Sequence, residues 1–200
     1  MKKLFLIPFF TLISAFALIP ATAYSHPHVI VTYDVSFLLN EHGVHGIKMN
    51  WDMDEMFSAS LIDSFDENKD GKFDANEIKV IENEAFSNLQ NYHYMTYSYL
   101  NDKPNKFFPA EKFHASINDG VVRYTFTLPV KVNAEKSKKT LEVSVYDESN
   151  FMSFSFTDSI EVETNNNPAF THSSNVKKKK VKTVYDTEES RNIAQLVFNK

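Results

Sequence analysis

The 200-residue sequence contains no cysteine and only four glycines. Without cysteine there is no disulfide framework, no thiolate metal site and no cysteine nucleophile. The glycines form no phosphate-cradling loop, and neither Gly-x-Ser-x-Gly nor His-Glu-x-x-His occurs, so the nucleotide-binding, serine-hydrolase and zinc-peptidase signatures are missing. We therefore expect a protein that is not an enzyme.

Long hydrophobic runs are also lacking, except at the start of the chain. Lys2 and Lys3 precede an apolar stretch at residues 4–20, and small residues follow at 21–25. This order is typical of a secretory signal peptide over residues 1–25, cleaved after Ser25 or after Ala23, with an uncleaved anchor as the alternative. No later segment approaches the ~20 apolar residues of a membrane span. We expect a periplasmic monomer with no membrane span in the mature chain.

The mature chain is expected to be acidic. Loss of Lys2 and Lys3 with the signal peptide would take the formal net charge from −5 to −7. A negative balance argues against nucleic acid as a partner and is compatible with cation binding.

Residues 66–77, reading D-E-N-K-D-G-K-F-D-A-N-E, match the twelve-residue calcium loop of an EF-hand. In that loop, oxygen ligands come from positions 1, 3, 5, 7, 9 and 12, and a glycine at position 6 allows a sharp turn, which is Gly71 here. Position 7 contributes its backbone carbonyl, and position 9 acts through a water. The predicted calcium ligands are Asp66, Asn68, Asp70, Lys72, Asp74 and Glu77. A solvated acidic loop is the alternative.

The flanking residues predict the two helices of an EF-hand over about 53–93. Phe57, Leu61 and Phe65 recur at four-residue spacing in an entering helix over 53–65, with Asp52 or Asp54 as its N-cap. An exiting helix is expected to continue to about His93. Asp74 and Glu77 stand three apart at its start, as in a capping box.

The rest of the chain alternates with a period of two, which favours β-strands. The expected strands cover residues 28–39, 44–51, 95–100, 112–117, 121–128, 140–145, 152–156 and 160–163. We predict an α+β fold, an antiparallel β-sandwich-like sheet with an inserted EF-hand helix-loop-helix hairpin. The single β-rich domain spans residues 26–163.

Residues 164–200 are predicted to lie outside that domain. A linker at 165–168 precedes five lysines within residues 177–182. A run of like charge is typical of a solvated flexible tail, and a contact with acidic lipid headgroups is the sharper alternative. Ile193, Leu196 and Val197 suggest a short amphipathic helix beyond it.

His26 and His28 are candidate ligands for zinc, copper or nickel. Cleavage after Ser25 would leave His26 as the first residue, so its α-amino group and imidazole could chelate an ion with His28. Two exposed histidines on a frayed terminus are the equally weighted alternative. His42 and His45 could join such a site if the first hairpin turn lay near the N-terminus.

Several of these segments occur together in one known family. His26 to Val29 directly after a signal peptide, residues 51–58, the calcium loop, and Tyr146-Asp147 follow in the same order. Over about residues 27–162 the chain resembles periplasmic proteins with a domain of unknown function that are encoded beside nickel/cobalt-type permeases, including ZevA-like zinc uptake proteins. Members usually carry proline after the Tyr-Asp pair, where this chain has Glu148.

The resemblance implies a non-enzymatic accessory role in moving a transition metal, zinc in particular, to a membrane permease. The first functional hypothesis is therefore a periplasmic protein that is shaped by Ca²⁺ and captures zinc through His26 and His28. The second is a calcium-stabilised protein-protein interaction module with no transition-metal role. A copper enzyme built on the N-terminal histidine is the third.

Overall fold

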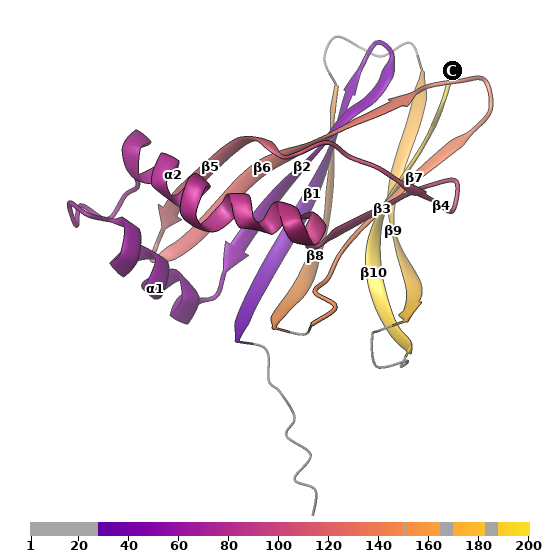
Figure 1. Ribbon diagram of the computed structural model, residues 1–200. Helices are drawn as coiled ribbons and strands as arrows, with labels where there is room; N and C mark the ends of the chain where they lie inside the picture. The colour runs from indigo at the N-terminus through magenta and orange to yellow at the C-terminus, as the bar shows by residue number, and fades with distance from the viewer. Residues whose placement is uncertain (1–27, 150, 165–169, 183–187) are drawn as a thin grey trace, which may run out of the picture.

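The chain folds mainly as β-structure. The computed structural model describes residues 28–149, 151–164, 170–182 and 188–200. Within these ranges, ten strands form two five-stranded sheets, ordered β5-β6-β2-β1-β8 and β4-β3-β7-β10-β9 (Figure 1).

The first sheet is built around a long antiparallel hairpin. Its strands are β1 (Val29–Asn40), β2 (Gly43–Met53), β5 (Glu111–Asn118), β6 (Val121–Asn133) and β8 (Met152–Thr164). β2 pairs antiparallel with both β1 and β6, whereas β8 pairs parallel with β1 at the edge.

The second sheet combines the middle of the chain with its last residues. Its strands are β3 (Thr96–Leu100), β4 (Lys103–Asn105), β7 (Lys139–Val145), β9 (Thr171–Lys182) and β10 (Glu188–Asn199). All of its pairings are antiparallel.

The two sheets share one hydrophobic core. In the first half of β1 alternate residues are buried, as the period of two predicts, because successive side chains of a strand point to opposite faces. Residues 35–39 are buried on both faces. The second sheet contributes Leu141, Val143, Leu196 and Phe198 to the same cluster, each at most 1% exposed. The arrangement is a sandwich of two sheets.

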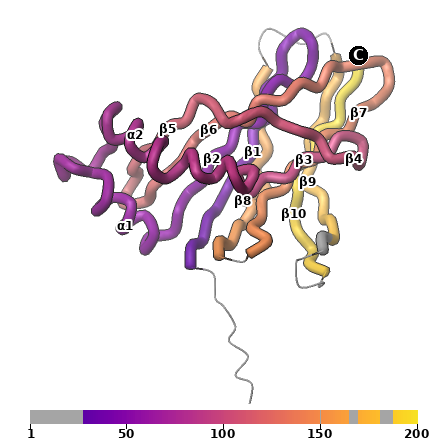
Figure 2. The backbone as a smooth tube through the Cα atoms, in the orientation of Figure 1, coloured from indigo at the N-terminus to yellow at the C-terminus, as the bar shows by residue number. Residues whose placement is uncertain are grey.

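A helical connector leads from the first sheet to the second. It consists of α1 (Glu55–Phe65), α2 (Ala75–Ile81), a π-helical turn η1 (Glu82–Phe86) and a 3₁₀ segment η2 (Ser87–Met95). Figure 2 shows this path as a tube that is purple at α1, turns magenta at α2 and ends in β3. The Phe86 ring stacks on Phe113 at 4.2 Å and tilts against Phe126 at 4.9 Å, so aromatic packing holds the connector on the first sheet.

The connector ends in three consecutive residues with left-handed backbone. His93, Tyr94 and Met95 have φ of 52°, 50° and 49°, a region that residues with a side chain rarely adopt. The Tyr94 ring is buried, and its hydroxyl accepts a hydrogen bond from the Ala110 backbone N–H at 3.0 Å. This buried anchor stabilises the turn into β3.

The predicted α+β fold class is wrong. The described chain is mostly β with two short α-helices, and the predicted EF-hand helix-loop-helix hairpin is not present. α1 has 11 residues and α2 only seven, because the helix expected to continue to about His93 changes to π and 3₁₀ geometry after Ile81. The expected caps do occur: Asp54 caps α1, and Asp74 and Glu77 form a capping box on α2.

The tail prediction is also wrong. The lysine-rich segment is strand β9, and the residues expected to form a short helix belong to β10. Lys177 and Lys179 both pair with Glu142 of β7, at 3.1 and 2.7 Å, so a buried carboxylate offsets part of the charge on this edge. The expected linker at 165–168 lies outside the described residues.

No helix in the part of the chain that the structure describes has the length and apolar character needed to cross a membrane. The expected signal peptide at 1–25 also lies outside the described ranges.

Candidate functional site

The predicted calcium loop joins α1 to α2. Asp66, the first predicted ligand, is the C-cap residue of α1 and is 5% exposed. The two carboxylate oxygens of Asp66 accept hydrogen bonds from the backbone N–H groups of Asp70 at 3.2 Å and Gly71 at 3.0 Å. These bonds fold the loop back over its own first residue.

Glu77, the predicted twelfth-position ligand, links the two ends of the loop. It is 7% exposed. One of its carboxylate oxygens accepts from the Glu67 backbone N–H at 2.9 Å, and the other from the Asp74 N–H at 2.8 Å. Glu77 thus ties the end of the loop to its start, and both Glu77 and Asp66, eleven residues earlier, line one hollow.

The middle of the loop is a series of tight turns. The side chains of Asn68, Asp70 and Asp74 accept from the backbone N–H groups two residues further on, at 2.7–2.9 Å. Gly71 has φ of +78° and open space where a Cβ would lie, as the predicted sharp turn requires.

Two carboxylates in this loop are buried without a cationic partner. Among the described residues, no ion pair involves Asp66 or Glu77, although Lys69 and Lys72 lie in the same loop. A buried charge is unfavourable unless it is paired or holds a metal. A hollow of about 560 Å³ opens beside both carboxylates, and Asp74 and Asn76 also line it.

The side chains do not converge as a finished cation cage. In the described ranges no group of three or more His, Asp or Glu side chains is placed to hold a metal ion. Asn68 and Asp70 are turned toward backbone amides instead. Full coordination would need these two side chains to rotate inward while the backbone of the loop kept its path.

The candidate transition-metal ligands are separated. His26 lies outside the described residues. His28 is exposed, its ring lies 5.1 Å from that of Phe151, and its N–H donates to the Phe151 carbonyl at 2.9 Å. His42 and His45 lie at the opposite end of β1, about 40 Å away at ~3.4 Å per residue, so they cannot join His28 in one site.

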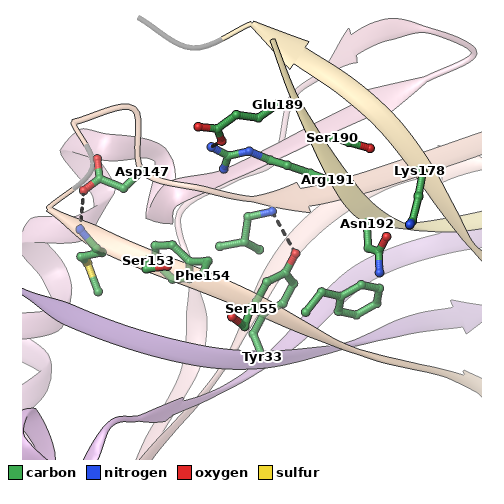
Figure 3. A pocket seen from close by; sticks show the side chains of 13 residues that line it. Tyr33, Asp147, Ser153, Phe154, Ser155, Lys178, Glu189, Ser190, Arg191 and Asn192 are labelled. Atoms are coloured by element: carbon green, nitrogen blue, oxygen red, sulfur yellow. Dashed lines mark hydrogen bonds and ion pairs between the residues drawn. The ribbon is translucent and has the colours of Figure 1, made fainter. Parts of the chain in front are cut away.

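A second hollow, which the sequence did not predict, lies between β8 and β10 (Figure 3). Its volume is about 660 Å³. Tyr33, Phe154 and Phe156 form an aromatic floor, and Lys178, Ser190 and Asn192 lie on the opposite side. The Tyr33 hydroxyl accepts from the Val145 backbone N–H at 3.4 Å, and burial raises the pKa of Tyr33 to about 12.

Arg191 carries the main charge of this groove. Its guanidinium lies 4.5 Å from the centre of the Tyr146 ring, and Nη2 donates to Glu189 at 2.6 Å. The Nε–H is buried and has no hydrogen-bond partner among the described residues. One signal in the sequence could have identified strand β10 and thereby the groove. This signal is the alternation of three buried apolar residues, Ala194, Leu196 and Phe198.

The sequence as a whole matches one protein family. The match covers residues 11–197 and is to the family described as Protein of unknown function (DUF1007). The chain belongs to this family. Its description assigns no activity, so membership in DUF1007 leaves the ZevA-like link a prediction.

Two curated relatives are themselves uncharacterised. One is a 15.5 kDa protein in the trpE 3′ region of Spirochaeta aurantia, 33% identical over 96 residues, which is 48% of this chain and 68% of that protein. The other is a Haemophilus influenzae protein, 24% identical over 136 residues. That match covers 66% of this chain and 63% of the relative, a little under two thirds of its length.

Two solved structures that match the chain weakly are acetylcholine-binding proteins. Type 1 of Biomphalaria glabrata has 10% identity and a TM-score of 0.44, with 91% of this chain and 89% of that chain covered. The protein of Bulinus truncatus has 11% identity and a TM-score of 0.39, with 88% and 89% covered. At TM-scores below 0.5, no relationship of fold or function is drawn from either.

Proposed function

We propose that this DUF1007 protein is an exported, non-enzymatic calcium-binding protein in which residues 66–77 hold one Ca²⁺. The observation that supports this proposal is the pair of buried carboxylates, Asp66 and Glu77, with no cationic partner among the described residues. A divalent cation between them would compensate both charges. The loop without the long helices of an EF-hand is the unit proposed to bind.

The other ligands follow from the chemistry of the loop. Asn68 and Asp70 supply side-chain oxygens after rotating inward, Lys72 supplies its backbone carbonyl, and Asp74 acts through a water. These are hard oxygen donors, which suit Ca²⁺. We expect weak affinity, with a Kd of about 10⁻⁴–10⁻³ M as in extracellular modules, because there is no second loop to support this one.

Calcium would act on the shape of the domain. The loop fixes where α1 ends and where α2 begins, and α2 continues into the connector that packs Phe86 on the first sheet. A protein ordered by Ca²⁺ in this way is suited to present a surface to a partner protein. This agrees with the hypothesis of a calcium-stabilised protein-protein interaction module.

Calcium titration with Glu77→Gln and Asp66→Asn variants tests the proposal. At about 100 times Kd, a ligand adds ~2.7 kcal/mol to the stability of a protein. For this chain length, each kcal/mol shifts Tm by about 2–4 °C. We expect Ca²⁺ to raise the Tm of the wild type by about 5–10 °C and to leave the Tm of both variants unchanged.

Glu55→Gln is the matched control, because Glu55 is exposed in the first turn of α1, outside both the loop and the hollow beside it, and should keep the full calcium response. Equal responses of wild type and Glu77→Gln, or no response of the wild type, would contradict the proposal.

Capture of zinc by His26 and His28, for delivery to a membrane permease, is the second candidate function. Exposure of His28 at the start of the described chain supports it, as does the ZevA-like resemblance. Isothermal titration with Zn²⁺ should show binding that is lost in His28→Ala and in a protein with one extra residue before His26. Unchanged affinity in both would leave calcium as the proposed metal of this protein.

A further inference from the structure

The groove of Figure 3 lies between two unpaired strand edges. In the described chain, β8 pairs on one side only, with β1. β10 pairs with β9 along its whole length, but its pairing with β7 begins at Ala194. The backbone edges at residues 152–156 and 189–192 therefore both face the groove without a partner strand.

Unpaired strand edges bind extended chains. Each edge offers backbone N–H and C=O groups that a further strand can satisfy. The β8 edge at residues 152–156 is about 17 Å long at ~3.3 Å per residue, which matches a peptide of about five residues. We propose that this groove binds an extended, acidic segment of a partner protein by strand addition.

The charge of the surrounding surface favours an acidic segment. On β9 and β10, Lys177 to Lys180 and Arg191 face Glu188 and Glu189, and Glu142 of β7 offsets two of these lysines, whereas the whole chain has a formal net charge of −5. This hairpin is thus a basic surface on an acidic protein. Opposite charge steers a partner to it.

The two carboxylates that line the groove already have partners. Asp147 accepts from the Ser149 and Met152 backbone N–H groups, and Glu189 is paired with Arg191. Asp158 of β8 accepts from the side-chain amide of the lining residue Asn192 at 2.8 Å. Lys178 has no ion-pair partner among the described residues, so Lys178 and the remaining donors of Arg191 can meet carboxylates of the bound segment.

The floor of the groove sets a second requirement. Tyr33, Phe154 and Phe156 present aromatic surface between the sheets, while Ser190 and Asn192 of β10 lie on the opposite side of the groove. Because side chains of a strand alternate between faces, the bound segment should carry apolar residues at every second position and acidic residues between them.

A labelled seven-residue peptide of alternating glutamate and valine is the probe, with binding to the full mature protein followed by fluorescence anisotropy. Saturable binding is expected for this peptide. We expect Lys178→Glu to weaken it about tenfold, since an attractive charge at the rim becomes repulsive. Lys136→Glu makes the same charge change at an exposed residue that does not line the groove and should leave binding unchanged.

Two further arms test the strand geometry. A peptide methylated on alternate backbone nitrogens cannot donate the ladder hydrogen bonds and should not bind. Ser155→Trp should block the groove, whereas the exposed control Ser137→Trp should not. On binding, amide hydrogen exchange should slow at residues 152–156 and 189–192.

Several outcomes would overturn the proposal. They are no binding of the peptide up to about 1 mM, equal binding of the methylated peptide, or protection elsewhere in the chain. Binding to phosphatidylserine vesicles without binding to the peptide would show a lipid contact of the lysines instead. Dimerisation through the same amides would identify a second copy as the occupant. The inference does not depend on calcium, so each proposal can fail alone.

Discussion

Ser58 of α1 is a fully buried serine whose hydroxyl joins the connector to the first sheet. It accepts a hydrogen bond from the Val122 backbone N–H at 3.0 Å and donates to the Met53 carbonyl at 3.2 Å. Both partners belong to strands, so this single side chain fixes the position of the helix that leads into the loop at residues 66–77.

Replacement of Ser58 should therefore destabilise the protein. In Ser58→Ala, two buried backbone groups lose their partner, and we expect the free energy of unfolding to fall by about 1–3 kcal/mol. Urea denaturation measures this change. Ser60→Ala on the exposed side of the same helix should stay within about 0.5 kcal/mol, and equal losses in the two variants would contradict the role of the buried hydroxyl.

Glu142 makes stability depend on pH. Burial raises the pKa of Glu142, but hydrogen bonds from Lys179, Lys177 and Gln195 outweigh burial, so the pKa lies below its ordinary value of 4.5. A depressed carboxyl pKa gives stability that is present above the unfolded value of 4.5 and is lost as pH falls through the folded value.

Glu142→Gln should accordingly lower the free energy of unfolding at pH 7 by about 1.5–3 kcal/mol, the range for hydrogen bonds to a charged group. The difference in the free energy of unfolding between wild type and variant should decrease below pH 4.5. Denaturation curves at several pH values give the measurement. Glu135→Gln, on an exposed pair with Lys139, is the control, and a gap that stays constant with pH would refute the assignment.

At the scale of elements, β10 is the strand that closes the core. Leu196 is fully buried and Phe198 is 1% exposed, although both lie within the last five residues. We expect Leu196→Ala to lower the free energy of unfolding by about 2–5 kcal/mol. Val176→Ala on neighbouring β9 removes an exposed side chain and should have a small effect. A Leu196→Ala protein as stable as wild type would restore the flexible-tail prediction.

The same strand shows why part of the fold could not be predicted from the sequence. Ile193, Leu196 and Val197 have helical spacing, but Ala194, Leu196 and Phe198 alternate as in a strand, and a short segment fits both patterns. The lysines of β9 suggested a solvated tail because Glu142, which neutralises two of them, lies 35 and 37 residues away in sequence. Pairings of that range leave no local signal.

Local patterns were more informative about the backbone of the first hairpin and of the loop at residues 66–77. The alternation at residues 28–39 and the turn after Asn40 predicted β1 and its partner β2, since both depend on neighbouring residues. Spacing also predicted both helix caps and the turn at Gly71. The spacing predicted too long an exiting helix, because η1 and η2 replace regular α-helix after Ile81. In this segment Phe86 packs on Phe113 and Phe126, which belong to strands later in the sequence.

At the scale of the whole molecule, the proposed calcium loop shares only Phe73 with the core cluster of the strands. The hydrogen bonds that Asp66 and Glu77 accept all come from backbone N–H groups of the loop itself, so removal of Ca²⁺ should loosen the connector and spare the sheets. We expect chelation to speed amide exchange in α1, α2 and η1 and to leave β2 and β6 protected, because local opening follows local contact.

Hydrogen exchange with mass spectrometry, with and without Ca²⁺ at equal ionic strength, tests this expectation. Mg²⁺ serves as the control, because it demands a smaller octahedral site. Uniform acceleration across both sheets would mean that the ion supports the whole domain.

The parallel pairing of β1 with β8 governs when the chain can fold. More than a hundred residues separate the partners Val29 and Met152, and the second sheet waits for the final dozen residues. During synthesis, which proceeds from the N-terminal side, β1 therefore lacks its parallel partner until residues 152–164 have been made. Such distant contacts slow folding, so docking of β8 on β1 should be a late step in folding.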